Sequence, residues 1–469
     1  MPGSTAFPAG FLWGSATAAY QIEGASHTDG RTDSIWDAFA RVPGAVHEGQ
    51  DGSVACDHYH RYAEDVALMQ QLGLGAYRFS VSWARVCPDG GEVNQAGLDF
   101  YSRLVDELLE ANIVPWLTLY HWDLPQALEE AGGWPARETA ERFVEYTAAV
   151  HDSLGDRVRF WTTMNEPWCS AFLGYGSGHH APGRTDGADA LRAAHHLMLA
   201  HGLAVRELRE RDSSLQLGLT LNFADVEAAS DSSGDEDARR RMDGLMNRYF
   251  LEPIMTGSYP EDVMKDVAPL MPEDLVHEGD LDIISTPIDV LGVNYYFGQS
   301  VSGVEPDQAA DAAAQARSQA PSANVGSEHV EVVSRDLSVT DMGWEVVPEG
   351  LRRLLVRLDT HYTAPAGTAM YVTENGAAYP DEPDENDYVD DQDRIAYLRS
   401  HLAAVHEAVE AGVNVRGYFL WSLIDNYEWA FGYSKRFGMV RVDYESGTRT
   451  PKASADWYAR VATQSELPD

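Results

Sequence analysis

Two glutamates, each at the end of an apolar run, are the residues of this sequence best placed to do chemistry. Glu166 lies in the segment TMNEP (163–167) and Glu374 lies in the segment TENG (373–376). A single glutamate in such a place is more often a solvated loop carboxylate than a reactive group. A pair is different, because cleavage of a glycosidic bond needs two carboxyl groups, one on each side of that bond. The pair therefore predicts acid–base chemistry of this kind.

Eight short β-prone runs, alternating with longer amphipathic segments, predict how these two side chains are positioned. This alternation is typical of βα units around a parallel sheet, and eight units predict a closed barrel. We therefore predict an α/β fold, a single (β/α)8 TIM barrel over residues 1–469, with its active site at the C-terminal ends of the strands. The strands before Glu166 and Glu374 are the fourth and seventh, nearly opposite each other. The predicted strands lie near residues 11–17, 75–81, 113–120, 158–164, 217–222, 289–294, 369–373 and 416–421.

The segments between these runs predict helices on the outside of the barrel. Apolar residues recur every three or four positions, so one face of each helix is expected to pack against the sheet. The clearest stripes are Leu98, Tyr101, Leu104, Val105, Leu108 and Leu109, then Leu351, Leu354, Leu355 and Leu358, and then Ile395, Leu398, Leu402, Val405 and Val409, with a stop signal at Gly412. Residues 225–241 and 303–330 are small and polar, and we expect loop insertions there, at the rim of the barrel.

The composition is that of a soluble globular protein with a large excess of acid. Hydrophobic residues make up 44% and charged residues 23%, and 34 Lys+Arg against 74 Asp+Glu give a net charge of −40. This charge repels nucleic acid and anionic membranes, so we expect neither as a partner and expect a neutral small molecule instead. The excess acid has two interpretations: it keeps the protein soluble, or it adapts the protein to high salt, where counterions screen the repulsion.

The cysteines and the N-terminal segment bear on the compartment. Cys56, Cys87 and Cys169 are odd in number and lack the spacing of a metal site, so we expect neither disulfides nor zinc and interpret them as small core residues. The first ten residues lack a basic stretch followed by an apolar run, and the sequence has no stretch of about 18 apolar residues. These features predict a cytoplasmic protein. The sequence does not fix the oligomeric state, and a homo-oligomer is compatible with it.

Eight motifs, spread over nearly the whole chain, resemble family 1 of the glycoside hydrolases, the β-glucosidase family. They occur in the order of the family, and nearly every one lies at a predicted strand end. The motifs are FLWGSATAAYQIEG (11–24), GAYRFSVSW (75–83), LYHWDLP (119–125), TMNEP (163–167), GVNYY (292–296), TENG (373–376), WSLIDNYEW (421–429) and KRFG (435–438).

The resemblance implies a role for each glutamate: Glu166 as the general acid/base and Glu374 as the nucleophile of a retaining reaction. We expect Arg78 and Tyr296 beside Glu374, where both favour its ionised form. Asn165 is expected to bond the 2-hydroxyl of the sugar, and Asn294 to support the carboxyl groups. Two carboxyl groups supply acid, base and nucleophile, so no metal or organic cofactor is expected.

The remaining motif residues resemble a sugar pocket. Polar and aromatic side chains of this kind bond sugar hydroxyls and stack on sugar rings. The resemblance implies a pocket for the non-reducing sugar (the glycone) formed by Gln21, His121, Asn165, Trp421, Glu428 and Trp429, and an entrance for the leaving group (the aglycone) formed by Trp344, Trp122, Trp168 and Phe437.

The same residues narrow the substrate class. The 6-phospho-β-glycosidases of the family have Ser in place of Glu428 and Tyr in place of Phe437, and only Lys435 matches their phosphate-binding set. Because Glu428 would repel a phosphate, we expect an unphosphorylated glycone. Thioglucosidases replace the acid/base, so the presence of Glu166 favours O-glycosides, namely cellobiose, short β-glucans and aryl or alkyl β-glucosides. The alternatives are β-galactosidase or β-fucosidase activity and transglycosylation on the same site. A sugar-binding protein without activity is disfavoured, because both glutamates are present.

Overall fold

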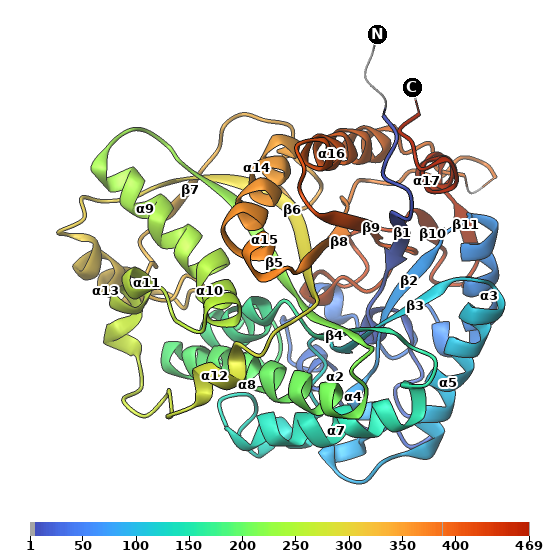
Figure 1. The fold of residues 1–469 in the computed structure, drawn as a ribbon, viewed down its shortest axis with the longest axis horizontal. Helices are drawn as coiled ribbons and strands as arrows, with labels where there is room; N and C mark the ends of the chain where they lie inside the picture. The colour runs from blue at the N-terminus through green and yellow to red at the C-terminus, as the bar shows by residue number, and fades with distance from the viewer. Residues whose placement is uncertain (1–4, 387, 469) are drawn as a thin grey trace.

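Eight parallel strands close into a barrel in the computed structural model, which describes residues 5–386 and 388–468 (Figure 1). The strand order is β5-β4-β3-β2-β1-β9-β8-β6, and β5 pairs with β6 to close the ring. All eight strands match predicted ones, so the (β/α)8 prediction is confirmed. The barrel strands are β1 Leu12–Ala16, β2 Ala76–Ser80, β3 Val114–Tyr120, β4 Phe160–Asn165, β5 Gln216–Ala228, β6 Val290–Ser302, β8 Ala369–Asn375 and β9 Val415–Trp421.

Helices surround this barrel, and their apolar faces pack against it as the periodicity predicts. Leu109 is an exception, because it is 40% exposed. It lies 100° around the helix from Leu108, at the edge of the apolar stripe, so the prediction that it is buried was wrong. The helices are α1 Ala19–Ile22, α2 Ile35–Ala40, α3 His58–Gln71, α4 Trp83–Val86, α5 Gln95–Glu110, α6 Gln126–Glu130, α7 Glu138–Leu154, α8 Gly187–Arg211, α9 Ser233–Asp243, α10 Tyr249–Thr256, α11 Glu261–Val267, α12 Asp280–Ile284, α13 Ala309–Gln319, α14 Pro348–Leu358, α15 Ala364–Ala366, α16 Gln392–Glu410 and α17 Ala453–Gln464.

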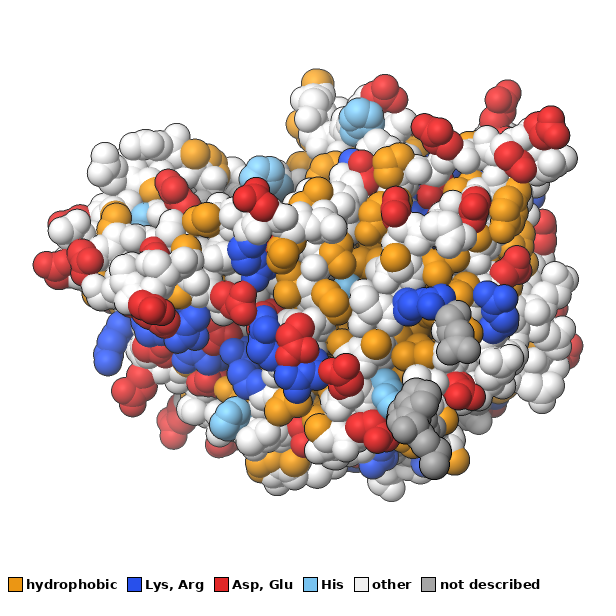
Figure 2. Space-filling model, turned by 90° about the horizontal axis from the view of Figure 1, so that it is seen from above, with side chains coloured by type: hydrophobic (Ala, Val, Ile, Leu, Met, Phe, Trp, Pro, Cys, Tyr) orange, Lys and Arg blue, Asp and Glu red, His pale blue; other side chains and the backbone are white. Residues whose placement is uncertain are grey.

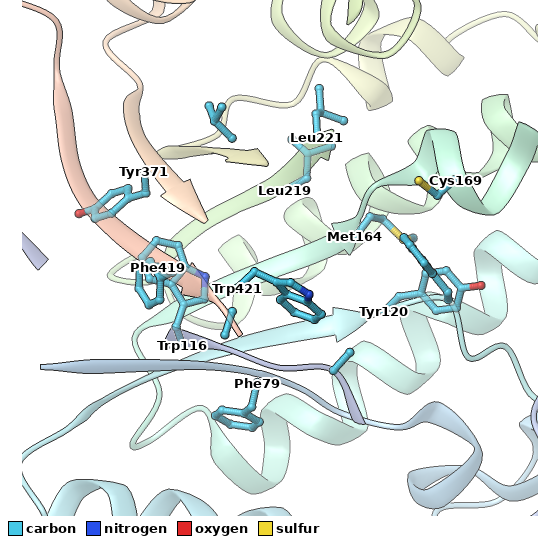
Figure 3. Packing of buried hydrophobic residues seen from close by; sticks show 14 of the residues in the cluster. Phe79, Trp116, Tyr120, Met164, Cys169, Leu219, Leu221, Tyr371, Phe419 and Trp421 are labelled. Atoms are coloured by element: carbon cyan, nitrogen blue, oxygen red, sulfur yellow. The ribbon is translucent and has the colours of Figure 1, made fainter. Parts of the chain in front are cut away.

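Aromatic side chains fill the amino-terminal half of the barrel interior (Figure 3). Trp116 of β3 packs against Phe160 at 4.6 Å, Tyr371 at 4.9 Å and Phe419 at 5.2 Å between ring centroids. Its indole N–H donates to the Thr162 hydroxyl at 2.8 Å, so the one polar atom of the ring is satisfied. The barrel is therefore a packed core and not a pore, and polar side chains have room at the carboxyl ends of the strands.

Residues 225–241 are more regular than the sequence predicted. β5 continues to Ala228, pairing with β6 as far as Ala228↔Val301 after a register shift, and α9 occupies 233–243. Two charged residues of this stretch are paired with distant segments: Asp225 with Arg353 and Glu227 with Arg335. The loop prediction was wrong here, because ion pairs with distant segments satisfy charges that look solvated in the sequence.

Residues 303–330 are irregular except for α13, which the sequence prediction missed. Alanine predominates in α13, and its high helix propensity explains the helix without a large apolar face. A short strand, β7 (Glu331–Val333), follows and pairs antiparallel with the end of β6. Two further strands, β10 (Val440–Val442) and β11 (Arg449–Pro451), form a separate hairpin. The extensions of β5 and β6 and the strand β7 thus build one side of the rim.

The surface reflects the composition. Figure 2 shows acidic side chains spread over the face in view, with basic side chains gathered in a band among them. No helix within the described ranges is both long and apolar enough to cross a membrane.

Candidate active site

Four barrel strands bring together a group of buried polar side chains: Arg78 from β2, Asn165 from β4, Asn294 from β6 and Glu374 from β8. Glu166 follows directly after β4 and has φ 48°, in the left-handed region that residues other than glycine rarely adopt. Its backbone N–H donates to the carbonyl of Thr220 in β5 at 2.9 Å, which holds the chain there. The two glutamates therefore lie at the ends of the fourth and seventh barrel strands, as predicted.

Glu374 is held by two charge-stabilising donors. Arg78 donates to Oε1 at 2.6 Å, and the Tyr296 hydroxyl donates to Oε2 at 2.6 Å. The expectation that both residues lie beside Glu374 is confirmed. The carboxylate is 3% exposed, so these bonds form where water cannot compete with them.

Glu166 has a different set of partners. The Asn294 amide donates to Oε1 at 2.7 Å, and the thiol of Cys169 donates to Oε2 at 3.3 Å. Neither partner carries a charge. Oε1 accepts a hydrogen bond from the Asn294 amide, and an amide N–H cannot accept one in return. The acidic proton of Glu166 therefore belongs on Oε2, the oxygen next to Cys169.

These environments separate the two carboxyl groups electrostatically. Burial, and then the nearby charge of Glu374, raise the pKa of Glu166 to about 8. Burial also raises the pKa of Glu374, but the Arg78 guanidinium, the Tyr296 hydroxyl and the Asn294 amide oppose that rise. Of the pair, Glu374 therefore loses its proton first and Glu166 keeps its proton near neutral pH. One acid and one carboxylate therefore lie close enough to interact electrostatically, and Asn294 is a neighbour of both.

Asn165 connects the two sides of the site. Its side-chain oxygen accepts from Arg78 at 2.6 Å and from Asn294 at 3.2 Å, and its amide lies 3.0 Å from Nε2 of His121. Burial and the charge of Arg78 hold the pKa of His121 well below its usual range, so the ring is neutral and Nε2 accepts. The ring proton is then on Nδ1, which is buried and has no hydrogen-bond partner within the described residues.

Gln21 and Glu428 form a second polar group, joined at 3.3 Å. The Gln21 amide also donates to the Asn426 side chain and the Tyr427 carbonyl, each at 2.9 Å, while its oxygen is buried without a partner in the part of the chain described. Burial, and then the charges of Glu374 and Glu166, raise the pKa of Glu428 to about 8. The site thus presents an unpaired donor, on His121, and an unpaired acceptor, on Gln21.

Aromatic rings divide into two groups around these polar side chains. His121 lies 5.8 Å from Trp421 and 6.0 Å from Trp429, with the rings nearly parallel, and Trp122 packs on Trp429 at 4.6 Å. The indole of Trp122 donates to the carbonyl of Asn165 at 3.0 Å. Trp122, predicted to shape the entrance with Trp344, packs with the rings of the predicted glycone pocket.

The second aromatic group surrounds Tyr296, the donor to Glu374. Trp344 lies 5.5 Å from Tyr296 and 6.3 Å from Phe437, and Phe437 lies 6.0 Å from Tyr296. The predicted entrance residues Trp344 and Phe437 are therefore neighbours. Trp168 packs against Phe172 at 5.9 Å, and its indole nitrogen is buried without a partner among the described residues.

Sequence reasoning missed the function-related contact of Cys169. The sequence predicts a small core residue at this position, and Cys169 is buried, but its sulfur lies against Glu166. The signal was its spacing: Cys169 follows Glu166 by three residues, and a turn in which the N–H of Cys169 donates to the carbonyl of Glu166 at 3.0 Å brings the two residues together.

The barrel holds one buried carboxylic acid and one buried carboxylate at the ends of its fourth and seventh strands. These are the two catalytic groups that a glycoside hydrolase needs. Comparison with known proteins agrees. A family described as Glycosyl hydrolase family 1 matches residues 3–467, and the chain belongs to this family.

Among the relatives, "Thermostable beta-glucosidase B" of Thermobispora bispora is 50% identical, covering 99% of this chain and 92% of its own length. "Bifunctional beta-D-glucosidase/beta-D-fucosidase" of Bifidobacterium breve is 48% identical, covering 97% of each chain. Among solved structures, a psychrophilic beta-glucosidase from Micrococcus antarcticus is 54% identical, covers 98% of each chain and has a TM-score of 0.93. The chain is an O-glycoside hydrolase with the fold of its family.

Proposed function

We propose that the chain acts, as one catalytic domain, as a retaining β-glucosidase on O-linked β-glucosides. The observation that carries this proposal is the shared position of Asn294, which donates to Glu166 at 2.7 Å and also favours the ionised form of Glu374. Two carboxyl groups that share a partner, one protonated and one ionised, suit attack on a sugar carbon with simultaneous protonation of the leaving oxygen. We expect the carboxyl groups to be about 5–5.5 Å apart.

In the first step Glu374 attacks the anomeric carbon while Glu166 gives the proton on Oε2 to the leaving oxygen. The bond to the aglycone breaks, and Glu374 becomes an ester of the sugar, so its negative charge disappears. That charge is one of the causes that raise the pKa of Glu166. Its loss lowers the pKa of Glu166, which then takes a proton from water as the water attacks the anomeric carbon. The bond between the sugar and Glu374 breaks, and the carboxylate of Glu374 is restored.

The unpaired polar atoms support a neutral sugar as the glycone. His121 Nδ1 offers a donor and Gln21 Oε1 an acceptor, both buried and without partners among the described residues. Sugar hydroxyls can satisfy both, whereas a phosphate would meet the carboxylate of Glu374, with Arg78 already engaged by Glu374 and Asn165. We therefore propose cellobiose, short β-glucans and aryl or alkyl β-glucosides as substrates. The bifunctional relative from B. breve supports a second activity on β-D-fucosides.

The test is labelling with a 2-deoxy-2-fluoro β-glucoside that carries a good leaving group, followed by peptide mass mapping. We expect one label, on Glu374, and no label in a Glu374→Gln variant. Label on another residue, or full activity without any label, would overturn the assignment. Proton NMR of the first product should show the β-anomer; the α-anomer would exclude the double displacement.

We further propose that the protein works in the cytoplasm, because Cys56, Cys87 and Cys169 are all free thiols in the structure. Cell fractionation with an antibody to the chain tests this directly. Recovery of the protein in the medium or the cell envelope would contradict it.

A further inference from the structure

An ion pair joins two segments at the mouth of the barrel. Lys435, in the segment after β9, donates to the carbonyl of Asp341 at 2.7 Å and to its carboxylate at 2.9 Å. The two side chains are 19% and 29% exposed, so the pair is partly withdrawn from solvent. Lys435 therefore has a defined partner in another segment and is not a free rim cation.

Asp341 belongs to a tight turn that presents Trp344. The N–H of Gly343 donates to the carbonyl of Thr340, and the N–H of Thr340 donates to the carbonyl of Trp344, each at 2.9 Å. The N–H of Asp341 donates to the carbonyl of Ala378 at 2.9 Å, in the segment that follows Glu374. The turn is thus attached to the segments after both β8 and β9, and the second attachment is Lys435.

The turn places a partly buried indole beside the reaction centre. Trp344 contacts Tyr296, which donates to Glu374, and Phe437, which lies two residues after Lys435. Phe437 is 2% exposed, whereas Trp344 keeps part of its surface open. Lys435 therefore lies two residues before Phe437, and Asp341 lies three residues before Trp344, so the ion pair joins the two segments that carry these rings.

We propose that Asp341 and Lys435 are positioning residues that fix Trp344 against Phe437 and so determine which leaving groups the enzyme prefers. This inference rests on the proposed function. The pair touches neither glutamate, so it acts on the side of the aglycone and leaves the chemistry at the glycone unchanged. Aromatic stacking, the interaction at stake, changes affinity on the order of 3- to 10-fold.

The test compares substrates that differ only in the leaving group. β-Glucosyl fluoride has a one-atom leaving group, and 4-methylumbelliferyl β-glucoside has a wide planar one. In Lys435→Met and Asp341→Asn variants we expect kcat/KM for the umbelliferyl substrate to fall about 3- to 10-fold, while kcat/KM for the fluoride changes less than about 2-fold. Lys435→Arg keeps the charge and the donors and should restore the umbelliferyl value.

A matched control is Arg142→Met, which removes an exposed ion pair with Glu145 on α7. It should change neither substrate. An equal loss on both substrates, or no loss on either, would overturn the positioning role. If the wild-type protein hydrolysed neither substrate, the proposed function itself would fail, and the positioning role with it; a wild type active on the fluoride separates the two cases.

Discussion

Replacing Cys169 by alanine should move the basic limb of the pH profile of kcat/KM to higher pH. That limb reports loss of the proton that the free enzyme must donate, and Glu166 holds this proton with a pKa of about 8. The Cys169 thiol bonds Oε2 at 3.3 Å and stabilises the ionised carboxylate, which lowers the pKa. Without the thiol, Glu166 stays protonated to higher pH.

The size of the shift follows from the strength of the bond. A hydrogen bond within a protein contributes about 0.5–1.5 kcal/mol, and one pKa unit corresponds to about 1.36 kcal/mol. Cys169→Ala should therefore raise the basic limb by roughly 0.4 to 1 pH unit. Cys169→Ser carries a stronger donor and should move the limb in the opposite direction. On the acidic side of the optimum both variants should stay within about 2-fold of the wild type.

The assay is initial-rate hydrolysis of an aryl β-glucoside between pH 5 and 10, with thermal denaturation of each variant at the optimum as a control for folding. Opposite shifts for alanine and serine identify the thiol as a partner of the acid. Shifts in the same direction, or unchanged limbs in both variants, would refute the reasoning, because loss of packing alone cannot depend on the strength of a donor.

Three further predictions follow from the described contacts. Glu374→Gln should lower kcat/KM by at least about 10³-fold without changing the far-UV circular dichroism, and an active variant would exclude this nucleophile. Arg78→Lys keeps the charge but loses one of the two directed bonds, to Glu374 and Asn165, which contribute about 1.5–3 kcal/mol each. This variant should lower kcat/KM roughly 10- to 150-fold and move the acidic limb of its pH profile to higher pH. An unchanged acidic limb would contradict the role of Arg78. Lys452→Met should lower the free energy of unfolding by about 3–5 kcal/mol in urea, because it leaves Asp425, paired with it at 2.7 Å, and Asp381 partly uncompensated inside the protein; a loss below 1 kcal/mol would contradict this.

The sequence was sufficient for the barrel because each strand is a short apolar run followed by polar residues. Glu166 and Glu374 could be found from the same pattern, since a charged group that follows a buried strand is costly unless it is used or paired. What could not be predicted depended on partners far away in the chain. The continuation of β5 is one case, because Asp225 looks solvated until Arg353 is brought beside it.

The contacts of Cys169 and Lys435 belong to the same class. A small thiol and a rim lysine have ordinary roles in most proteins, and neither the spacing of Cys169 from Glu166 nor the motif around Lys435 predicts these particular contacts. Their significance depends on which atom lies opposite: Oε2 of Glu166 in one case and the turn before Trp344 in the other. Such contacts form when the barrel closes and brings distant segments together. The hydrophobic periodicity of the sequence predicts the barrel but not which atoms then meet.

Three residues of the site have a backbone conformation that is costly for residues with a side chain, and the large barrel is needed to hold them in it. Trp122, Glu166 and Trp429 have φ of 74°, 48° and 51°, a conformation that costs of order 1–3 kcal/mol for each residue with a side chain. Two of them are fixed by the packing of Trp122 on Trp429, and the third by the bond from Glu166 to β5. Together with buried charges at Glu374 and Arg78, this is a considerable local cost, and the packed barrel core below the site is what stabilises it. In its stability, though not in its activity, a site of this kind therefore tolerates conservative changes in its polar atoms better than changes in the residues that hold its backbone.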